Sequence, residues 1–265
     1  MNRLNAEDLL ILRSAVRKLE GHSYAMTIAS KVGMPVEALL KMLPGPAQEK
    51  VSLAVNKALE QCLHLALTPA AASFQPPPSR RVHTLVSAAT GAAGGFFGLA
   101  GLVVELPVTT TVMLHSIAGI ARAHGEDLSQ PEAALSCLQV LALGPDGKQS
   151  QTHESAYYAT RAAMAQVTRD AVAFLAQKGT AKEGAPILLS FLAKIAARFG
   201  LEVSEKAAAQ LIPIAGAVGG LTLNVLFMNH FQRLAEGHFA IRALERKYSS
   251  ALIQEEYERL QPVSV

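Results

Sequence analysis

The chain has 265 residues, of which 50% are hydrophobic and 17% are charged, so it is more apolar and less charged than an average soluble domain. Its formal net charge is only +3, and it has no basic run with interleaved aromatic residues, which argues against nucleic-acid binding. The two cysteines form neither a disulfide framework nor a zinc pattern, as is typical of a reducing compartment. Because the N-terminus is charged and amphipathic rather than signal-like, we expect a cytoplasmic protein.

The first 67 residues predict a helical arm. Asn5 is placed to cap a first helix whose opening turn is acidic. Residues 47–67 repeat apolar side chains at three- and four-residue steps, which predicts a long amphipathic helix. Three consecutive prolines in 68–81 favour extended backbone and cannot continue that helix. We therefore predict a proline-rich linker at 68–81 between the arm, residues 1–67, and a helical body at 82–260.

The body opens with an apolar stretch, residues 82–121, in which Glu105 is the only Asp, Glu, Lys or Arg. A second apolar stretch, residues 207–232, contains a similar block of glycine and alanine. Glycine costs a helix about 1 kcal/mol relative to alanine, but small residues three and four apart let another helix approach closely. The glycines that we assign to helix packing or membrane insertion are Gly91, Gly94, Gly95, Gly98, Gly101, Gly216, Gly219 and Gly220.

Helical patterns continue through the rest of the body. Ser129 and Glu132 form a capping-box pattern at the start of one of these helices. Apolar repeats at helical spacing predict helices at 133–143, 157–177, 186–199 and 238–260. Because no segment shows a convincing strand alternation, the predicted fold class is all-α, a multi-helix bundle around two central glycine-rich apolar helices.

Residues 82–104 and 207–232 lack Asp, Glu, Lys and Arg, and each is longer than the roughly 20 residues that a helix needs to cross a bilayer. Basic residues flank both segments, as membrane-surface anchors do. Their glycines and polar side chains favour instead two buried helices of a globular protein. Three interpretations stay open: a buried helix pair, peripheral or reversible membrane association, and integral spanning.

Two blocks of the chain resemble the EcsC family: ATGAAGGFFGLAGLVVELPVTTTVMLHSIAGIARAHGEDL and IPIAGAVGGLTLNVLFMNHFQRLAEGHFAIRALERKY. The similarity runs from about Leu19 to Tyr248 and includes LPGPAQEKVSLAVNKALEQ. The family takes its name from the third gene of an operon whose other members encode the ATPase and membrane subunits of an ABC transporter. The resemblance therefore implies a bacterial intracellular protein with a membrane connection, and it implies no reaction.

From this resemblance and the apolar stretches we expect a non-enzymatic accessory or interaction protein, peripheral on the inner face of the cytoplasmic membrane. Its expected partners are a membrane surface or a membrane protein, with nucleic acid excluded and homo-oligomerisation left open. Such a protein should expose an apolar patch of several hundred square ångström.

Glu105 is the sharpest candidate for chemistry. A carboxylate buried in an apolar helix costs several kcal/mol unless it is paired, protonated or hydrated. Such a group is a candidate proton carrier, metal ligand or general base. The alternative is a helix break at 105–107, where the carboxylate reaches water or caps the following helix. The partners that the sequence suggests for Glu105 are Arg122, His115, His230 and Arg233.

The histidines beside the apolar stretches suggest a rival function. His230 and His238 are eight residues apart and lie near one face of a helix if it is unbroken. With Glu105 and His115 they would combine imidazole and carboxylate ligands, which suit zinc or non-haem iron. The rival is thus a metal-binding protein or a hydrolase-type enzyme. No H-E-x-x-H, G-x-S-x-G or P-loop motif occurs, and no cofactor-binding residues are indicated.

Overall fold

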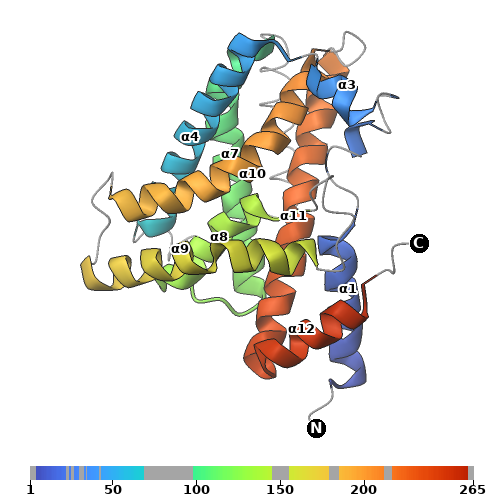
Figure 1. The fold of residues 1–265 in the computed structure, drawn as a ribbon, viewed down its shortest axis with the longest axis vertical. Coiled ribbons are helices and arrows are strands. Elements are labelled where there is room, and N and C mark those ends of the chain that lie inside the picture. The colour runs from blue at the N-terminus through green and yellow to red at the C-terminus, as the bar shows by residue number, and fades with distance from the viewer. Residues whose placement is uncertain are drawn as a thin grey trace.

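A computed structural model describes residues 4–21, 24, 27–29, 33, 35–41, 43–68, 98–144, 155–178, 185–211 and 217–261. Within these ranges the chain forms helices and no strand, which confirms the predicted all-α class. The helices are α1 (Ala6–Leu19), α3 (Val36–Lys41), α4 (Gly45–Leu67), α7 (Gly98–Ala123), α8 (Pro131–Gln139), α9 (Ala156–Lys178), α10 (Pro186–Gln210), α11 (Ala217–Lys247) and α12 (Ser250–Arg259), with a 3-10 turn, η1 (Val140–Ala142), after α8 (Figure 1).

The long helix α11 is the centre of the arrangement, since α1, α7, α10, η1 and α12 all pack against it. The helix α4 packs against α7 and α10, and α9 packs against α10 and α8. In Figure 1, α1 and α12 lie beside the lower part of α11, at the opposite end of the molecule from α3. Contacts from every side explain why so many side chains of α11 are buried.

One hydrophobic core joins the first 67 residues to the rest of the chain. Leu12 of α1, Leu59 of α4, Met113 of α7 and Phe231 of α11 are all fully buried members of it. Each such side chain stabilises the fold by roughly 1.5–3 kcal/mol relative to leaving it exposed. Apart from Thr68, the predicted linker at 68–81 lies outside the described residues.

The two predicted helix caps have different outcomes. The Asn5 side chain accepts a hydrogen bond from the Asp8 amide at 2.7 Å, which confirms the predicted cap of α1. The capping box is wrong, because α8 has Gln130 at its N-cap position with no side-chain cap. The Ser129 hydroxyl donates instead to Asp127 at 2.7 Å. Because α8 starts at Pro131, Ser129 lies one residue before the N-cap and is not placed to accept from the amides of the first turn.

The helix break predicted at 105–107 is also wrong. The helix α7 runs through Pro107 without interruption. Proline leaves the carbonyl four residues earlier, that of Val103, without its helical N–H donor. Packing of α7 against α4, α8, α10 and α11 keeps the helix intact despite this loss.

The second apolar stretch, residues 207–232, is not one central helix as predicted. Its first residues, up to Gln210, lie in α10, and its residues from Ala217 onward lie in α11. The sequence between the two helices contains Pro213, a residue that disfavours a continuous helix. Past this stretch, α11 continues to Lys247, so the helix predicted at 238–260 is divided between α11 and α12.

The glycine assignments fall mostly at the edge of the described chain. Gly98 and Gly101 lie in the first turns of α7, and Gly219 and Gly220 lie in the first turn of α11. Their role in helix packing or membrane insertion stays a prediction. The remaining assigned glycines, Gly91, Gly94, Gly95 and Gly216, lie outside the described residues.

Among the described residues, one segment, Val103–Ala123 of α7, is long and apolar enough to cross a membrane. Length and composition alone select it, and more than half of it is buried inside the protein. A buried core helix of a soluble protein has the same properties, so this segment is weak evidence for spanning. It also differs from the two spans considered from the sequence, which were 82–104 and 207–232.

Candidate functional site

Glu105 lies on the inner face of α7, where three helices meet. Its side chain accepts three hydrogen bonds, each 2.9 Å long and each ending on the same atom, Oε1. The donors are Lys206 Nζ from α10, Asn224 Nδ2 from α11, and Thr109 Oγ1 one turn further along α7. Lys206, Asn224 and Thr109 have no exposed surface, and Glu105 is only 6% exposed. We call these four residues the Glu105 cluster.

The charges of the Glu105 cluster compensate each other. Burial raises the pKa of Glu105, but the attraction of Lys206 and the three hydrogen bonds outweigh burial and bring that pKa below its ordinary value. The Lys206 ammonium also lies 5.0 Å from the centroid of the Phe227 ring, a cation–π distance. An ionised carboxylate held by three donors is a poor general base near neutral pH. The cluster is therefore built to hold helices together.

His230 lies further along α11 between an acidic and a basic side chain. Its Nε2 is 3.2 Å from Glu202 Oε2 of α10, within ion-pair distance but not aligned as a hydrogen bond. Its Nδ1 is 3.4 Å from Arg233 Nη2. Because arginine only donates, Nδ1 must accept, and we assign the ring proton to Nε2, facing Glu202. This arrangement fixes the tautomer of His230 and the orientation of its ring.

His238 lies two turns beyond His230, in a different set of contacts. Its Nδ1 is 3.0 Å from the hydroxyl of Tyr157 on α9, and that hydroxyl oxygen also accepts from Arg161 Nη1 at 3.3 Å. Burial lowers the pKa of His238 well below its ordinary value, and the positive charges of Arg161 and Arg242 lower it further. His238 Nε2 is buried with no hydrogen-bond partner among the described residues. His238 is thus a neutral imidazole held in the core.

Arg161 and Tyr157 extend this set of contacts to α1 and α12. Arg161 makes a two-pronged pair with Glu245 of α11, at 2.7 and 3.0 Å. The ring of Tyr257 from α12 stacks on that of Tyr157 with centroids 5.6 Å apart, and its hydroxyl donates to Glu20 at 2.8 Å. We call the whole set the Tyr157 network, which consists of Glu20, Ser155, Tyr157, Tyr158, Arg161, His238, Glu245 and Tyr257.

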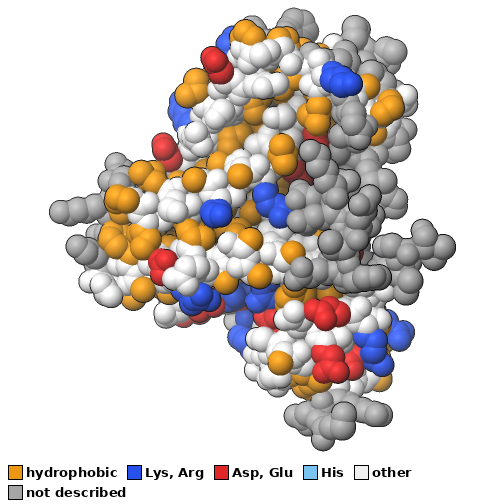
Figure 2. Space-filling model, in the orientation of Figure 1, with side chains coloured by type: hydrophobic (Ala, Val, Ile, Leu, Met, Phe, Trp, Pro, Cys, Tyr) orange, Lys and Arg blue, Asp and Glu red, His pale blue; other side chains and the backbone are white. Residues whose placement is uncertain are grey.

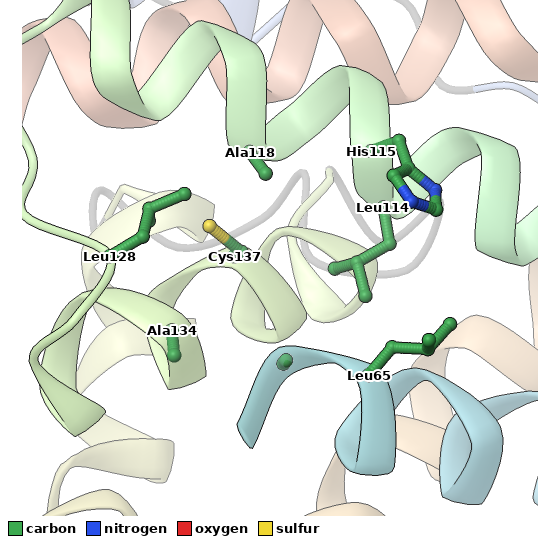
Figure 3. Close-up of a pocket in the computed structure, with 8 residues that line it drawn as sticks. Leu65, Leu114, His115, Ala118, Leu128, Ala134 and Cys137 are labelled. Atoms are coloured by element: carbon green, nitrogen blue, oxygen red, sulfur yellow. The ribbon is translucent and has the colours of Figure 1, made fainter. Parts of the chain in front are cut away.

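His115 belongs to neither group. It lies on the C-terminal half of α7, and its Nδ1 donates to the Thr111 carbonyl at 2.7 Å. His115 lines an apolar pocket between α4, α7 and α8, shown in Figure 3. The cavity volume is about 20 Å³, enough for roughly one water molecule. Cys137 lines the same pocket, and burial raises the pKa of its thiol to about 12. The Cys137 thiol in this pocket is therefore protonated near neutral pH.

The structure does not bring the four candidate residues together. Glu105 and His115 are ten residues apart on α7, a rise of roughly 15 Å, and His230 and His238 are separated by roughly 12 Å along α11. Within the described parts of the chain, no three His, Cys, Asp or Glu side chains are placed to hold a metal ion. The geometry of the described residues therefore does not favour a metal centre built on these four residues.

The partners suggested for Glu105 from the sequence are not those that it has. Its hydrogen bonds come from Lys206, Asn224 and Thr109 rather than from Arg122, His115, His230 or Arg233. A signal for Lys206 was present, since it is the charged residue directly before the second apolar stretch. Nothing in the sequence pattern distinguished Asn224 from the other polar residues of that stretch.

The model of the EcsC protein family matches residues 11–244. The chain belongs to the EcsC protein family. The match begins in α1 and ends in α11, so it contains the whole Glu105 cluster and leaves α12 outside. Comparison of this EcsC protein with curated proteins and with solved structures gave no match. Family membership confirms the resemblance and assigns no activity.

Proposed function

We propose that this EcsC protein is a non-enzymatic accessory protein at the inner surface of the cytoplasmic membrane. There it would work beside a membrane protein, and the operon behind the family name suggests an ABC transporter as one such partner. The observation that carries the proposal is the N-terminal half of α7. Here a helix of membrane-like composition has apolar side chains exposed to solvent on one side. On its buried side, the charge of Glu105 is neutralised by Lys206.

Two valines form the exposed side of this half of α7 among residues 103–110, whose side chains the structure describes. Val104 is 73% exposed and Val108 is 45% exposed. They are four residues apart and so lie on one face of the helix, while Glu105 and Thr109, with the same spacing, are buried. Burying a valine in an apolar phase is worth roughly 1.5–3 kcal/mol. Two such side chains support reversible attachment to a membrane surface.

A second helix adds to the exposed apolar surface. Leu189 and Leu201 of α10 are 45% and 53% exposed. Figure 2 shows hydrophobic side chains gathered where the N-terminal end of α10 lies beside the C-terminal end of α9, with Lys and Arg side chains on the same face. Apolar side chains next to basic ones suit an anionic lipid surface.

The non-enzymatic part of the proposal rests on the candidate residues themselves. Glu105 is ionised and bonded to three donors, and His230 faces Glu202 and Arg233. Lys206 and Asn224 have no exposed surface through which a substrate could reach them. Because these side chains already contact each other through hydrogen bonds and charge interactions, they support a structural role.

The test is sedimentation of the purified protein with vesicles of phosphatidylethanolamine and phosphatidylglycerol. We expect the wild type to bind these vesicles. Val104→Asp/Val108→Asp should bind them with roughly tenfold lower affinity, because each new carboxylate must be desolvated at an anionic surface. Leu10→Asp/Leu53→Asp is the matched control, since it adds the same charge at exposed leucines of α1 and α4. A wild type that stays in solution, or a control that loses as much binding, would overturn the proposal.

Cells expressing the tagged protein give the second measurement. Membranes are washed first with high salt and then with alkaline carbonate. Interfacial binding predicts that the protein resists salt and is released by carbonate. Protein found wholly in the soluble fraction would contradict the proposed location, and retention through carbonate would mean that the chain is integral to the membrane.

A further inference from the structure

We propose that the Glu105–Lys206 pair is a latch, which lets the part of α7 before Pro107 open away from α10 and α11 and close again. This inference deepens the proposed function, because the open form would present Leu106, which is fully buried in the closed form, to a membrane. The motion itself is inferred from the contacts of α7 and can be tested without any membrane.

A weak point in the backbone lies directly beside the latch. Pro107 removes the helical hydrogen bond to the Val103 carbonyl. Three residues later the Thr110 hydroxyl donates to the Leu106 carbonyl at 2.7 Å, a contact that bends helices. Sharp bends in helices occur at prolines and at such inserted bonds. A hinge in α7 is therefore expected at 106–110.

The polar contacts of α7 are distributed unequally on the two sides of this hinge. Before it, the hydrogen bonds that the described residues make to α10 and α11 all end on Glu105 Oε1. After it, Ser116 accepts from Gln232 at 2.8 Å, and Glu126, which lies just past the end of α7, accepts from Arg242 at 2.8 Å. The C-terminal half of α7 and the turn after it thus keep polar contacts with α11 when Glu105 is released.

A charged latch opens more easily than an apolar contact of the same size. Both side chains lose water on closing, and this desolvation cancels much of their mutual attraction. On opening, the Glu105 carboxylate and the Lys206 ammonium regain that hydration, whereas exposing apolar side chains to water would cost free energy. The attraction between the two charges still selects one closed geometry, since 0% of Lys206 and 6% of Glu105 are exposed.

This argument predicts that two kinds of substitution act in opposite directions. Lys206→Met leaves the Glu105 carboxylate buried without its counter-charge, so the segment should open more often. Glu105→Gln/Lys206→Met replaces the pair by uncharged side chains of similar length, and the glutamine oxygen can still accept from Asn224 and Thr109, so the segment should open less often. A pair that only stabilises the fold would change exchange over the whole chain in both variants, rather than at residues 103–110 alone.

The measurement is amide hydrogen exchange followed by mass spectrometry on the full chain. For peptides covering 103–110 we expect exchange roughly tenfold faster in Lys206→Met and several-fold slower in the double variant than in the wild type. Peptides covering 112–123 should change little. Arg161→Met/Glu245→Met is the matched control, because it removes an ion pair from another part of α11 and should leave 103–110 unaffected.

The double variant decides the outcome even where Lys206→Met does not fold. If residues 103–110 exchange as fast in the double variant as in the wild type, the latch is wrong. So would acceleration in Lys206→Met that spreads evenly over the chain. If the exchange pattern holds but no form of the protein binds vesicles, the latch stands and the proposed membrane function fails. If the wild type binds vesicles, the double variant should bind them several-fold more weakly.

Discussion

The two buried polar groups that contact α11 are built on different plans. In the Glu105 cluster, one carboxylate oxygen accepts from Lys206, Asn224 and Thr109, so three helices depend on one atom. In the Tyr157 network, the bonds are spread over eight residues from α1, α9, α11 and α12. The first plan concentrates the interactions, and the second distributes them.

The difference has consequences for what each group can do. Loss of Glu105 removes all three bonds of its cluster at once. Loss of one contact in the Tyr157 network leaves the stacked pair of Tyr157 and Tyr257 and the edge-on pair of Tyr158 and Tyr257, at 5.1 Å, in place. Each aromatic pair adds about 0.5–1.5 kcal/mol beyond its area burial. A concentrated group suits a contact that is made and broken, and a distributed one suits a fixed support.

The largest expected effect tests this comparison directly. Removing one partner of a buried ion pair costs about 3–5 kcal/mol, because the other charge stays buried alone. Since opening of α7 can hydrate Glu105, we expect the lower value, about 3 kcal/mol, for Lys206→Met. Urea unfolding followed by circular dichroism measures the change. A loss under about 1 kcal/mol, typical of a surface pair, would mean that Glu105 finds another partner or water.

A smaller effect is expected from the corresponding change in the Tyr157 network. Glu245→Gln removes the negative charge facing Arg161, but Arg161 still donates to Tyr157 and its guanidinium stays 5.4 Å from that ring. A hydrogen bond to a charged group is worth about 1.5–3 kcal/mol, and the glutamine oxygen keeps part of it, so we expect a loss near 1.5 kcal/mol. The same urea titration measures it. If Glu245→Gln costs as much as Lys206→Met, the contrast between the two groups is wrong.

Local sequence patterns were enough to predict the all-α class and several helices. The cap at Asn5 and the long helix ending at Leu67 depend on residues within one or two turns of each other, so periodicity and capping rules reveal them. Glu105 stood out for the same kind of reason, as one charge in an apolar stretch. Family membership was predictable too, because long blocks of sequence carry it.

What the sequence did not reveal depends on contacts between distant residues. Lys206 is 101 positions from Glu105, and Asn224 is 119 positions away. Helix continuity through Pro107 depends on the four helices that pack around α7, which outweigh the local cost of proline. In both of these cases contacts with other helices decided the result. The capping box failed because α8 starts at Pro131, which places Gln130 rather than Ser129 at the N-cap.

The smallest expected effect is a pH dependence of stability, which we expect from the Tyr157 network and not from the Glu105 cluster. The lowered pKa of His238 means that the folded state keeps this ring neutral, whereas the unfolded chain takes up a proton near pH 6.5. The unfolded state therefore gains protons first as the pH falls, and folding loses about 1.4 kcal/mol between pH 7.5 and 5.5 through this group. His238→Gln should abolish that loss in urea titrations at the two pH values.

The Glu105 cluster should not respond in this range. Its lowered pKa means that its contribution is complete above the ordinary value of 4.5 and is lost only as the pH falls through the lower, folded-state value. Between pH 7.5 and 5.5 the exchange of residues 103–110 should therefore stay constant relative to the rest of α7.

Two outcomes would contradict these expectations. If the free energy of unfolding of His238→Gln changes with pH as much as that of the wild type, His238 is not a buried neutral imidazole. Acid-induced opening at 103–110 in the same range would instead place the pH-sensitive group beside the latch.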